Sequence, residues 1–422
     1  MMNADNRWWA IIFALPLAGI LNTQAQAGDP IADVLAARQN IEWGDNFDVA
    51  VKSDADVRTS VPVLSDQVVS ALATAIAEYS SIATNGGWPI VSAQTRLQIG
   101  VRDASVAQLR RRLTISGDLA PTNMLSDAYD SYVVEAVERF QARHGIQVDG
   151  VVGASTLAAL NVPVEFRLAQ LTMNLDRLKG LGYRSASRFV MVNIPAARVE
   201  AVESGRVVAR HTAIAGKVDR PSPILSSKVT EVNFNPFWTV PKSIIRKDLI
   251  PTVRKNPAYL SEYGIRILDA KGIEIQPEQI DWNTDDAVGY TFRQDPSEIN
   301  SLGSVRINFP NNDSVYMHDT PNKGLFNDEF RFASSGCVRI RGVRDLVTWL
   351  LRDNSDWSPE RVGVMFGNGE RLDVKLATPV PVFWTYITAW TTEDGVVQFR
   401  DDVYGLDREQ QLAFSRAADA PL

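Results

Sequence analysis

The chain has 422 residues, of which 45% are hydrophobic and 22% charged, and its formal net charge at pH 7 is -7. This composition is that of a globular protein, so disordered and fibrous classes are excluded, and the length suffices for two or three domains. No long run of Lys or Arg is present, which removes the electrostatic basis for nucleic-acid binding.

The N-terminus has the features of an export signal. Arg7 precedes an uncharged run over residues 8–21, and Ala25-Gln26-Ala27 offers the small residues that signal peptidase requires. We therefore predict a signal peptide over residues 1–27 and an exported mature protein. A membrane anchor is the alternative, but about 14 apolar residues are too few to span a bilayer comfortably. No integral membrane span is expected after cleavage.

A helical segment is predicted over residues 28–99. Its clearest helix starts after Ser65, a suitable N-cap, and stops at Asn85-Gly86-Gly87. The apolar side chains of this helix recur at helical spacing, at Val68, Leu72, Ile76 and Tyr79. The segment carries no residues that indicate chemistry.

Residues 100–162 are predicted to form a compact unit of three short helices. Apolar residues at helical spacing mark the first two helices, and glycines with turn chemistry precede the third, Thr156 to Leu160. Residues 140–157 (FQARHGIQVDGVVGASTL) resemble the peptidoglycan-binding-domain-1 family, a three-helix module that binds the cell wall or acts as a spacer. His144 is interpreted as structural, because a histidine at the end of a helix faces the negative end of its dipole.

A linking helix over residues 163–187 precedes a domain of different periodicity. Apolar residues then alternate with polar ones, so residues 188–368 are predicted to be mostly β. A polar, loop-rich stretch at 246–300 is interpreted as an insertion over the sheet and a candidate lid. Residues 369–422 are predicted to form a C-terminal hairpin around Asp394-Gly395 and a tail. The whole chain is thus expected to be an α+β multidomain protein.

The chain has one cysteine, Cys337, and three histidines, of which His318 lies nearest to it in the sequence. A lone cysteine cannot form an internal disulfide, and a free thiol in an exported protein risks oxidation. His318 ends a predicted strand, and a connection with turns at Pro321 and Gly324 leads to Cys337. Such a connection can bring both side chains to the same end of a sheet, where an imidazole can generate a nucleophilic thiolate.

Gly336 lets a substrate approach the backbone closely, and the N–H groups of Gly336 and Cys337 are candidates for an oxyanion hole. The alternative is a buried, unreactive cysteine beside a hydrogen-bonded histidine, and the spacing alone does not exclude it. His211 has no motif around it and is interpreted as a structural strand residue. No pair among the histidines and the cysteine has metal-ligand spacing, so neither a metal nor another cofactor is expected.

The residues around Cys337 and His318 resemble a known family. Residues 316–321 (YMHDTP) and 334–339 (SSGCVR) are similar to the catalytic motif of L,D-transpeptidases with a YkuD domain. Many members have His at the position of Ser335, and the Ser-Ser form resembles the large, Gram-negative YcbB-like branch. Residues 235–241 (NPFWTVP) also fit that branch, whereas Ser297 stands where the branch has Gly in the lid loop.

The resemblance implies a periplasmic peptidoglycan L,D-transpeptidase, with a mostly-β catalytic domain and an inserted lid. Cys337 would attack the third residue of a tetrapeptide donor, meso-diaminopimelate, and release the terminal D-Ala. A diaminopimelate amine of a second stem peptide would then take the acyl group, which gives a 3→3 crosslink. Carbapenem-type inhibitors are expected to acylate such an enzyme.

Roles for individual residues follow from the same resemblance. His318 is expected to act as the base, and Ser335 or a backbone carbonyl to orient its imidazole. Arg339 is expected to bind a carboxylate of the stem peptide with its guanidinium fork, although a structural salt bridge is its alternative. Pocket walls are expected at Tyr316 and Trp238, for which a place in the aromatic core is the alternative.

Two other functions remain open at this point. One is a hydrolase with the same site, an L,D-carboxypeptidase or endopeptidase with water as acceptor; the other is a non-catalytic wall-binding protein. The set of His318, Gly336, Cys337 and Arg339 argues against the second. Because the imidazole would stabilise a thiolate, the pKa of Cys337 is expected to lie below that of an ordinary thiol. The lid is expected to exclude water and so to favour amine acceptors.

Overall fold

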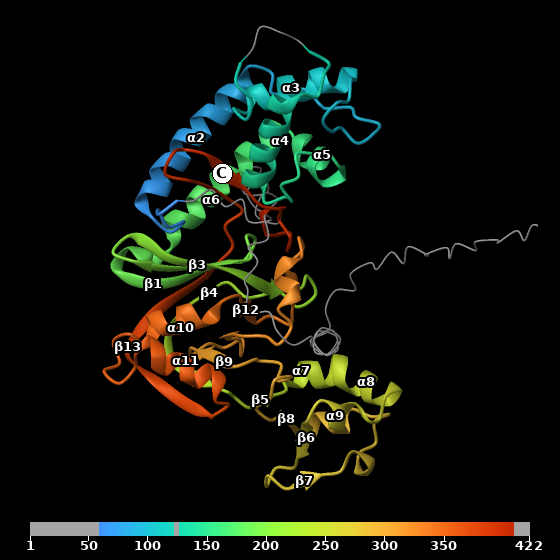
Figure 1. Cartoon of the computed structure of the whole chain (residues 1–422), viewed down its shortest axis with the longest axis vertical. Helices are drawn as coiled ribbons and strands as arrows, with labels where there is room; N and C mark the ends of the chain where they lie inside the picture. The colour runs from blue at the N-terminus through green and yellow to red at the C-terminus, as the bar shows by residue number, and fades with distance from the viewer. Residues whose placement is uncertain (1–58, 122–125, 409–422) are drawn as a thin grey trace, which may run out of the picture.

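The computed structural model describes residues 59–121 and 126–408, which form a barrel, a lid subdomain, a helical layer and a helical module (Figure 1). The predicted signal peptide, the first part of the predicted segment 28–99 and the end of the tail lie outside the described residues. The fold is a mixed α+β arrangement around a mostly-β domain, as the sequence predicts. No helix within the two described stretches is long and apolar enough to cross a membrane.

A nine-stranded sheet forms the barrel, in the order β11-β3-β12-β10-β9-β4-β13-β1-β2. Its strands are β1 (Arg188–Asn193), β2 (Arg198–Glu203), β3 (Arg206–Gly216), β4 (Leu225–Phe234), β9 (Val305–Asn308), β10 (Met317–His318), β11 (Phe332–Ser334), β12 (Val338–Ile340) and β13 (Leu372–Thr385). Because β2 also pairs with β3, all of these strands except β11 form a closed ring. The inward-pointing side chains form the main core together with helices α10 (Val343–Leu351) and α11 (Pro359–Gly367).

Strand β13 is the main difference from the sequence expectation. The sequence places the residues after 368 in a hairpin and tail, but β13 runs through the middle of the sheet, antiparallel to β4 and parallel to β1. The hairpin is shorter: β14 (Ala389–Thr391) pairs with β15 (Val397–Phe399) around Asp394 and Gly395. The pairing partners of β13 are distant in the sequence, so local periodicity does not identify them.

The lid subdomain, residues 238–302, connects β4 to β9 and has its own hydrophobic core. It contains a four-stranded sheet in the order β5-β8-β6-β7 and a run of helices. Its elements are β5 (Trp238–Thr239), α7 (Lys242–Ile244), a π-helix (Ile245–Leu249), α8 (Ile250–Lys255), α9 (Tyr259–Glu262), β6 (Ile265–Leu268), β7 (Glu274–Ile275) and β8 (Thr291–Gln294). Figure 1 shows it in yellow tones, projecting from one end of the barrel.

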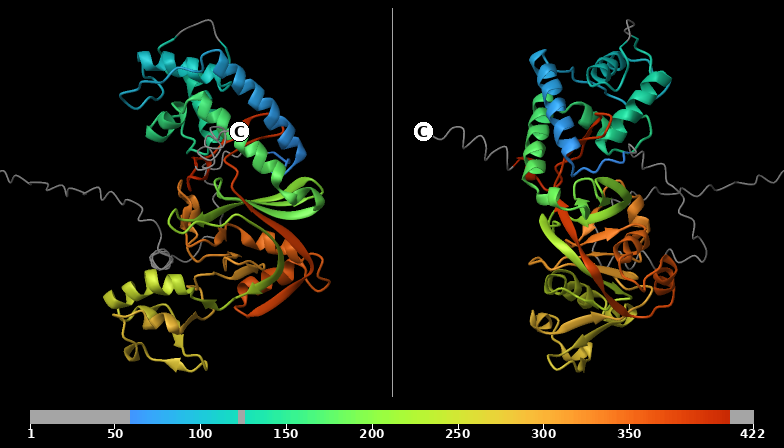
Figure 2. Two further views of the ribbon diagram at one scale, coloured as in Figure 1. Left: turned by 180° about the vertical axis from the view of Figure 1, so that it is seen from behind. Right: turned by 90° about the vertical axis from the view of Figure 1, so that its left-hand side faces the viewer.

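Helices α2 (Asp66–Thr84) and α6 (Val164–Gly180) lie side by side on the outer surface of the barrel (Figures 1 and 2). Their apolar stripes form a second core with outward-pointing side chains of β1, β2 and β13 and with the β14–β15 hairpin. Met191 and Phe383 are members of this core that come from the barrel sheet. The sheet is therefore buried on both surfaces in this region.

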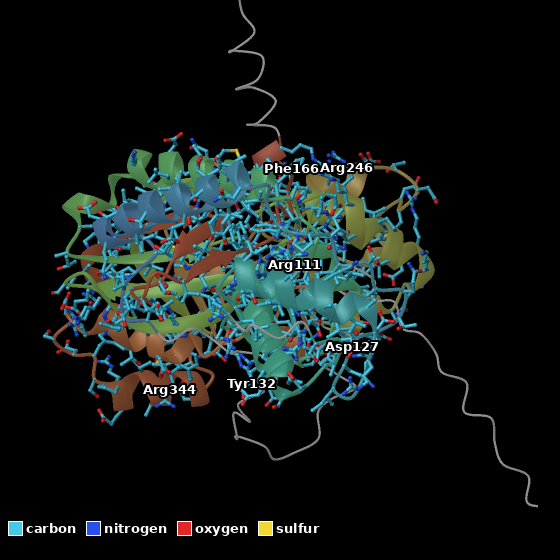
Figure 3. The ribbon with its side chains drawn as sticks, turned by 90° about the horizontal axis from the view of Figure 1, so that it is seen from above. Arg111, Asp127, Tyr132, Phe166, Arg246 and Arg344 are labelled. Atoms are coloured by element: carbon cyan, nitrogen blue, oxygen red, sulfur yellow. The ribbon has the colours of Figure 1, made fainter. Side chains whose placement is uncertain are left out.

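The helical module consists of α3 (Ala104–Ile115), α4 (Ser131–His144) and α5 (Ala154–Leu160) around a core of its own. It is inserted between α2 and α6. Trp88 Nε1 donates to Val162 O at 3.0 Å, and a Cβ on Gly87 would lie 3.2 Å from Val164. Seen from above, the module helices cover one end of the molecule, with the 70% exposed Tyr132 at their surface (Figure 3). The two ends of the module's chain therefore meet next to one another.

Candidate active site

Pairing among four strands places a row of polar side chains on the outer surface of the barrel. His318 in β10 pairs with Arg306 in β9 on one side and with Arg339 in β12 on the other. Arg306 in turn pairs with Asn233 in β4. Paired residues point to the same surface of a sheet, so these four side chains lie in line. The residues next to them in sequence belong to the main core, which fixes the direction of the row.

Cys337 directly precedes β12 and, by the alternation of side chains along that strand, belongs to the same surface as Arg339. Its thiol is free and half-buried. Gly336 has a φ of +106°, a backbone conformation that L side chains rarely adopt. Because β12 and β10 are hydrogen-bonded neighbours, the structure brings Cys337 and His318 together at one end of the sheet.

Hydrogen bonds fix the backbone around the thiol. Ser334 Oγ donates to Cys337 O at 2.5 Å and accepts from Gly336 N at 3.2 Å. Ser222 Oγ donates to Gly336 O at 2.9 Å from a neighbouring loop. The N–H of Gly336 is therefore already occupied, and the predicted oxyanion hole would depend on the N–H of Cys337.

Ser335 contacts an arginine, not the imidazole. Its Oγ accepts a hydrogen bond from Arg220 Nη1 at 3.1 Å, and the same guanidinium makes two hydrogen bonds to Asp248 of the lid subdomain. No hydrogen bond joins Ser335 to His318 in the described part of the chain. A charged guanidinium is a stronger donor than a neutral imidazole, so the expectation that Ser335 orients His318 is corrected. The buried Nδ1 of the imidazole has no hydrogen-bond partner among the described residues.

Tyr316 lies between the lid subdomain and the thiol. Its hydroxyl hydrogen-bonds with Trp238 and with Cys337, and its ring centroid is 5.6 Å from that of His318. Trp238 is 4% exposed and belongs to the core of the lid subdomain. Tyr316 is therefore a wall beside the thiol, whereas Trp238 supports that wall from the lid side.

Asp319, the residue that follows β10, fixes the end of this strand. Asp319 accepts from Ser304 N at 3.1 Å and forms an ion pair with Lys323. Gly303, at a φ of +60°, lies against this carboxylate, and a Cβ there would be only 2.6 Å from it. This packing fixes the backbone that carries His318.

Burial sets the charge states of the two reactive groups. It raises the pKa of the Cys337 thiol to about 11, against smaller effects of Tyr316 and Arg339 that lower it. Burial, followed by the charge of Arg339, lowers the pKa of His318 to about 3. Both groups are therefore neutral at pH 7, and the expectation of a lowered thiol pKa is wrong for the free protein. The thiol pKa is raised because the surrounding residues exclude water from the thiol and the imidazole before a substrate binds, which disfavours the charged form of each group.

A neutral imidazole beside a neutral thiol can accept its proton when the sulfur attacks a carbonyl carbon. Arg339 is 5% exposed, and its charge lowers the pKa of both Cys337 and His318. A guanidinium in this place favours negative charge on the sulfur and suits a substrate carboxylate. No group of side chains in the described stretches could hold a metal ion.

The other two histidines have structural contacts. His144 is buried, its Nδ1 lies 2.7 Å from Phe140 O, and its ring stacks on Phe140 with centroids 3.8 Å apart. His211 is also buried, with Nδ1 3.1 Å from Arg341 O. Burial lowers the pKa of both, as expected for neutral histidines in a packed interior.

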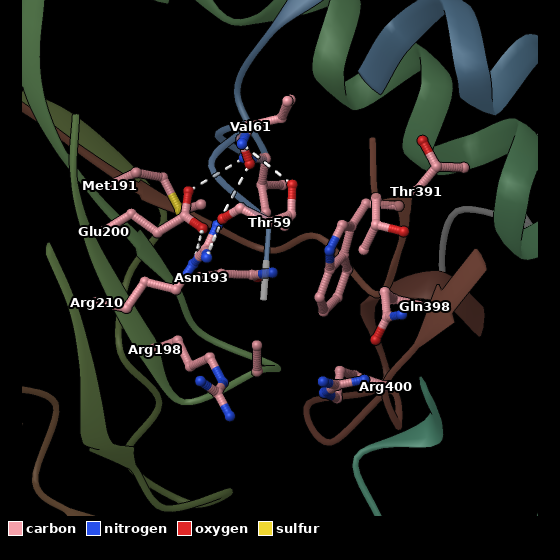
Figure 4. Close-up of a pocket in the computed structure, with 14 residues that line it drawn as sticks. Thr59, Val61, Met191, Asn193, Arg198, Glu200, Arg210, Thr391, Gln398 and Arg400 are labelled. Atoms are coloured by element: carbon pink, nitrogen blue, oxygen red, sulfur yellow. Dashed lines mark hydrogen bonds and ion pairs between the residues drawn. The ribbon is translucent and has the colours of Figure 1, made fainter. Parts of the chain in front are cut away.

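Two cavities lie away from this site. One of about 30 Å³ lies between β1, β2 and the β14–β15 hairpin, and in it Arg210 Nε binds Glu200 at 2.9 Å (Figure 4). The other, of about 500 Å³, lies on the module, with Glu329 from the connection between β10 and β11 at its edge. Neither is lined by a thiol or an imidazole.

Sequence reasoning missed the residues that hold the cysteine in place. Ser222 and Arg220 lie in the string RPSP, residues 220–223, which resembles the family but carries no sign of its role. Asp248 and Ser334 were missed as well, because their partners depend on the packing of the lid against the barrel. Arg306 was missed although a basic residue in an apolar strand was visible.

Comparison with known families agrees with this geometry. Residues 187–382 match the "L,D-transpeptidase catalytic domain" family, YkuD, and residues 102–160 match the "Putative peptidoglycan binding domain" family. A "Putative L,D-transpeptidase" of Haemophilus influenzae is 34% identical over 245 residues, which make up 58% of this chain and 49% of that protein. The chain thus spans about half the length of this curated relative.

Solved structures of low identity also align with the chain. An L,D-transpeptidase from Xylanimonas cellulosilytica is 16% identical and covers 70% of this chain and 99% of its own, with a TM-score of 0.21. The LD transpeptidase LdtMt1 in complex with imipenem is 16% identical and covers 47% of this chain and 59% of its own, with a TM-score of 0.21.

The region with the barrel and its Cys337–His318 surface thus matches the family model of the YkuD-type L,D-transpeptidase catalytic domain. This particular chain joins that domain to a peptidoglycan-binding-domain-1 module, which lies between helices α2 and α6.

Proposed function

We propose that this protein is a peptidoglycan L,D-transpeptidase that forms 3→3 crosslinks through an acyl-enzyme on Cys337. The observation that supports it best is the row formed by Arg339, His318 and Arg306 beside the only thiol. This arrangement supplies a nucleophile, a neutral base and fixed positive charge on one surface. Peptidoglycan stem peptides carry the carbonyl groups, amines and carboxylates that these groups can use.

In the first half-reaction His318 takes the proton of the Cys337 thiol as the sulfur attacks the carbonyl of the third stem residue. The Cys337 N–H donates to the developing oxyanion. The bond to the terminal D-Ala then breaks, and His318 returns the proton to the leaving amine. The product is a thioester between Cys337 and the tripeptide stem, with one D-Ala released.

In the second half-reaction a diaminopimelate amine of another stem attacks the thioester. His318 removes a proton from that amine, the C–S bond breaks, and the proton returns to the sulfur. A thiol with a high pKa is a poor leaving group in this step. The charge of Arg339 and the Tyr316 hydroxyl both offset this effect by stabilising the departing sulfur. The lid subdomain, tied to the cysteine loop through Arg220, limits access of water.

The exported location belongs to the same proposal. Peptidoglycan lies outside the inner membrane, so the signal-peptide pattern of residues 1–27 and the wall-binding type of module are consistent with a periplasmic enzyme. The module would keep the catalytic domain near its substrate, either by binding the wall or by acting as a spacer.

The nucleophile is tested with a carbapenem, whose strained carbonyl can acylate a reactive thiol. Incubation of the purified protein should add the mass of one inhibitor molecule, and the modified peptide should contain Cys337. The Cys337→Ala variant should stay unmodified and remain folded by circular dichroism. A stable adduct in that variant, or none in the wild type, would refute the assignment of Cys337.

A further inference from the structure

Arg306 has no acidic partner. Its Nε donates to Asn233 Oδ1 at 2.9 Å, and no carboxylate lies within ion-pair distance of its guanidinium among the described residues. By contrast, Arg371 pairs at 2.5 Å with Asp373, the strand partner of Asn233. A half-buried arginine without a carboxylate has unused donors that can bind one.

The amide of Asn233 keeps Arg306 away from the nearest acids. Its Nδ2 donates to Glu231 at 2.6 Å and to Asp373 at 2.9 Å, while its Oδ1 accepts from Arg306. Asn233 therefore holds the guanidinium in place without neutralising it. Tyr316 supports it from a neighbouring strand, with the guanidinium carbon 5.5 Å from the ring centroid.

The position of Arg306 relative to the base assigns it to the second half-reaction. Cys337 and Arg339 belong to one flank of His318, because both lie at β12, so a donor bound as thioester occupies that flank. Arg306 lies on the opposite flank, in β9. Its charge is felt at the reactive groups, since it lowers the pKa of both His318 and Cys337. In the second half-reaction, an amine that gives its proton to His318 would approach from the β9 flank, opposite to the thioester.

We propose that Arg306 binds a carboxylate on the carbon that carries the attacking amine, and so selects α-amino-acid acceptors over simple amines. The free end of a diaminopimelate side chain has this structure, with an amine and a carboxylate on one carbon. When the guanidinium binds the carboxylate, the amine nitrogen, two bonds from the carboxylate carbon, is directed toward the imidazole. The proposal rests on the transpeptidase function and names the acceptor chemistry of that site.

The test measures how the acyl-enzyme partitions between two added amines. The full-length protein is given a disaccharide tetrapeptide with D-methionine or with D-methioninamide, which lacks only the carboxylate. Exchange products are separated by mass, and each rate is divided by the rate of acyl-enzyme formation, so that effects on the first half-reaction cancel. The wild type should prefer D-methionine, and Arg306→Gln should reduce this preference about tenfold or more.

Three further variants separate recognition from structural damage. Asn233→Asp keeps Arg306 but gives it an acidic partner, so it should lower the preference in the same direction. Arg371→Gln removes a charge from the same surface, from an arginine already paired with Asp373, and should keep the wild-type preference. Arg306→Lys should restore part of the preference, because an ammonium retains the charge but not the fork.

Two results would overturn the proposal. They are a wild type without any preference, and an Arg306→Gln variant that keeps the wild-type preference because its rates with both amines are unchanged or equally reduced. A wild type that forms the acyl-enzyme but yields only tripeptide with every amine would refute the transpeptidase function itself and the acceptor site with it. The first two results leave the transpeptidase function standing, so the two failures are distinguishable.

Discussion

The half-buried Cys337 and the buried His318 are both neutral groups in the free protein. The pKa of Cys337 is raised to about 11 and that of His318 lowered to about 3, in both cases mainly because burial disfavours the charged form. The free protein thus holds a protonated thiol and a neutral imidazole. In the proposed mechanism, proton transfer therefore accompanies attack on the substrate, without a preformed ion pair.

This charge state gives a pH prediction. The rate of Cys337 alkylation by iodoacetamide should rise with pH through an inflection above the value of ~8.5 of an unperturbed thiol. Tyr316→Phe removes a hydrogen bond that lowers the thiol pKa, so its inflection should lie still higher. The variant's circular dichroism should match the wild type. An inflection below ~8.5 would mean that a thiolate–imidazolium pair exists in the free protein.

Residue types at the site were predictable from the sequence, but their electrostatics were not. Cys337, His318, Gly336 and Arg339 lie in short motifs, and strand alternation explains why three of them share a surface. Whether the thiol pKa is raised or lowered depends on how deeply the surrounding residues bury the thiol. One of these residues is Tyr316, which also contacts Trp238 in the lid subdomain. No local pattern reports such burial.

At the scale of elements, an ion pair joins Asp248 of the lid subdomain to Arg220 in the loop between β3 and β4. Arg220 and Asp248 have side chains only 13% and 9% exposed, and Arg220 also holds Ser335. Asp248 lies in the π-helix Ile245–Leu249, a rare element that is frequent at functional sites. The guanidinium of Arg220 thus couples the position of the lid to the cysteine loop.

Breaking this pair should affect stability and acylation differently. Asp248→Asn removes the carboxylate that makes two hydrogen bonds to Arg220, while the longer ion pair with the exposed Asp219 remains, and should lower the free energy of unfolding by roughly 3 kcal/mol in urea titrations. The double variant Arg220→Met, Asp248→Leu removes both charges and should recover most of that stability. Acylation by a tetrapeptide donor should remain slow in both, because Ser335 and the lid lose their link. A double variant that acylates at the wild-type rate would show that the pair only stabilises the fold.

At the scale of the whole molecule, the module is an insertion between two helices that belong to the catalytic half. Helices α2 and α6 cover the outward-pointing Phe189, Met191 and Phe383 of the barrel sheet. The module touches the C-terminal hairpin through His144 and Phe399, whose ring centroids are 5.4 Å apart, and through Arg400, which donates to Arg143 O at 3.2 Å. The helical layer is therefore part of the catalytic fold, whereas the module is an addition to it.

Two truncations should thus behave differently. Replacement of residues 89–162 by a short Gly-Ser linker should leave a folded protein that is still acylated, since Gly87 and Val164 are neighbours. A chain that starts at Arg188 lacks α2 and α6, exposes the second core and should aggregate. Light scattering and carbapenem labelling distinguish the two. A well-folded, reactive chain from Arg188 would contradict the role given to the helical layer.

The sequence predicted this architecture only in part. Periodicity identified the helical regions and the β domain, because helix and strand patterns are local. It did not identify β13, whose partners β1 and β4 lie far away in the chain, or the packing of α2 on the barrel. Such long-range pairings arise from burial of both surfaces of a sheet, which a local pattern does not specify.

Product analysis with purified disaccharide tetrapeptide tests the central claim most directly. We expect dimers joined through two diaminopimelate residues, one D-Ala released for each crosslink, and no product from Cys337→Ala. Mass spectrometry identifies the dimers by the mass of two stems less one D-Ala, and fragmentation locates the bond. Release of tripeptide alone at saturating tetrapeptide would contradict the account and indicate an L,D-carboxypeptidase.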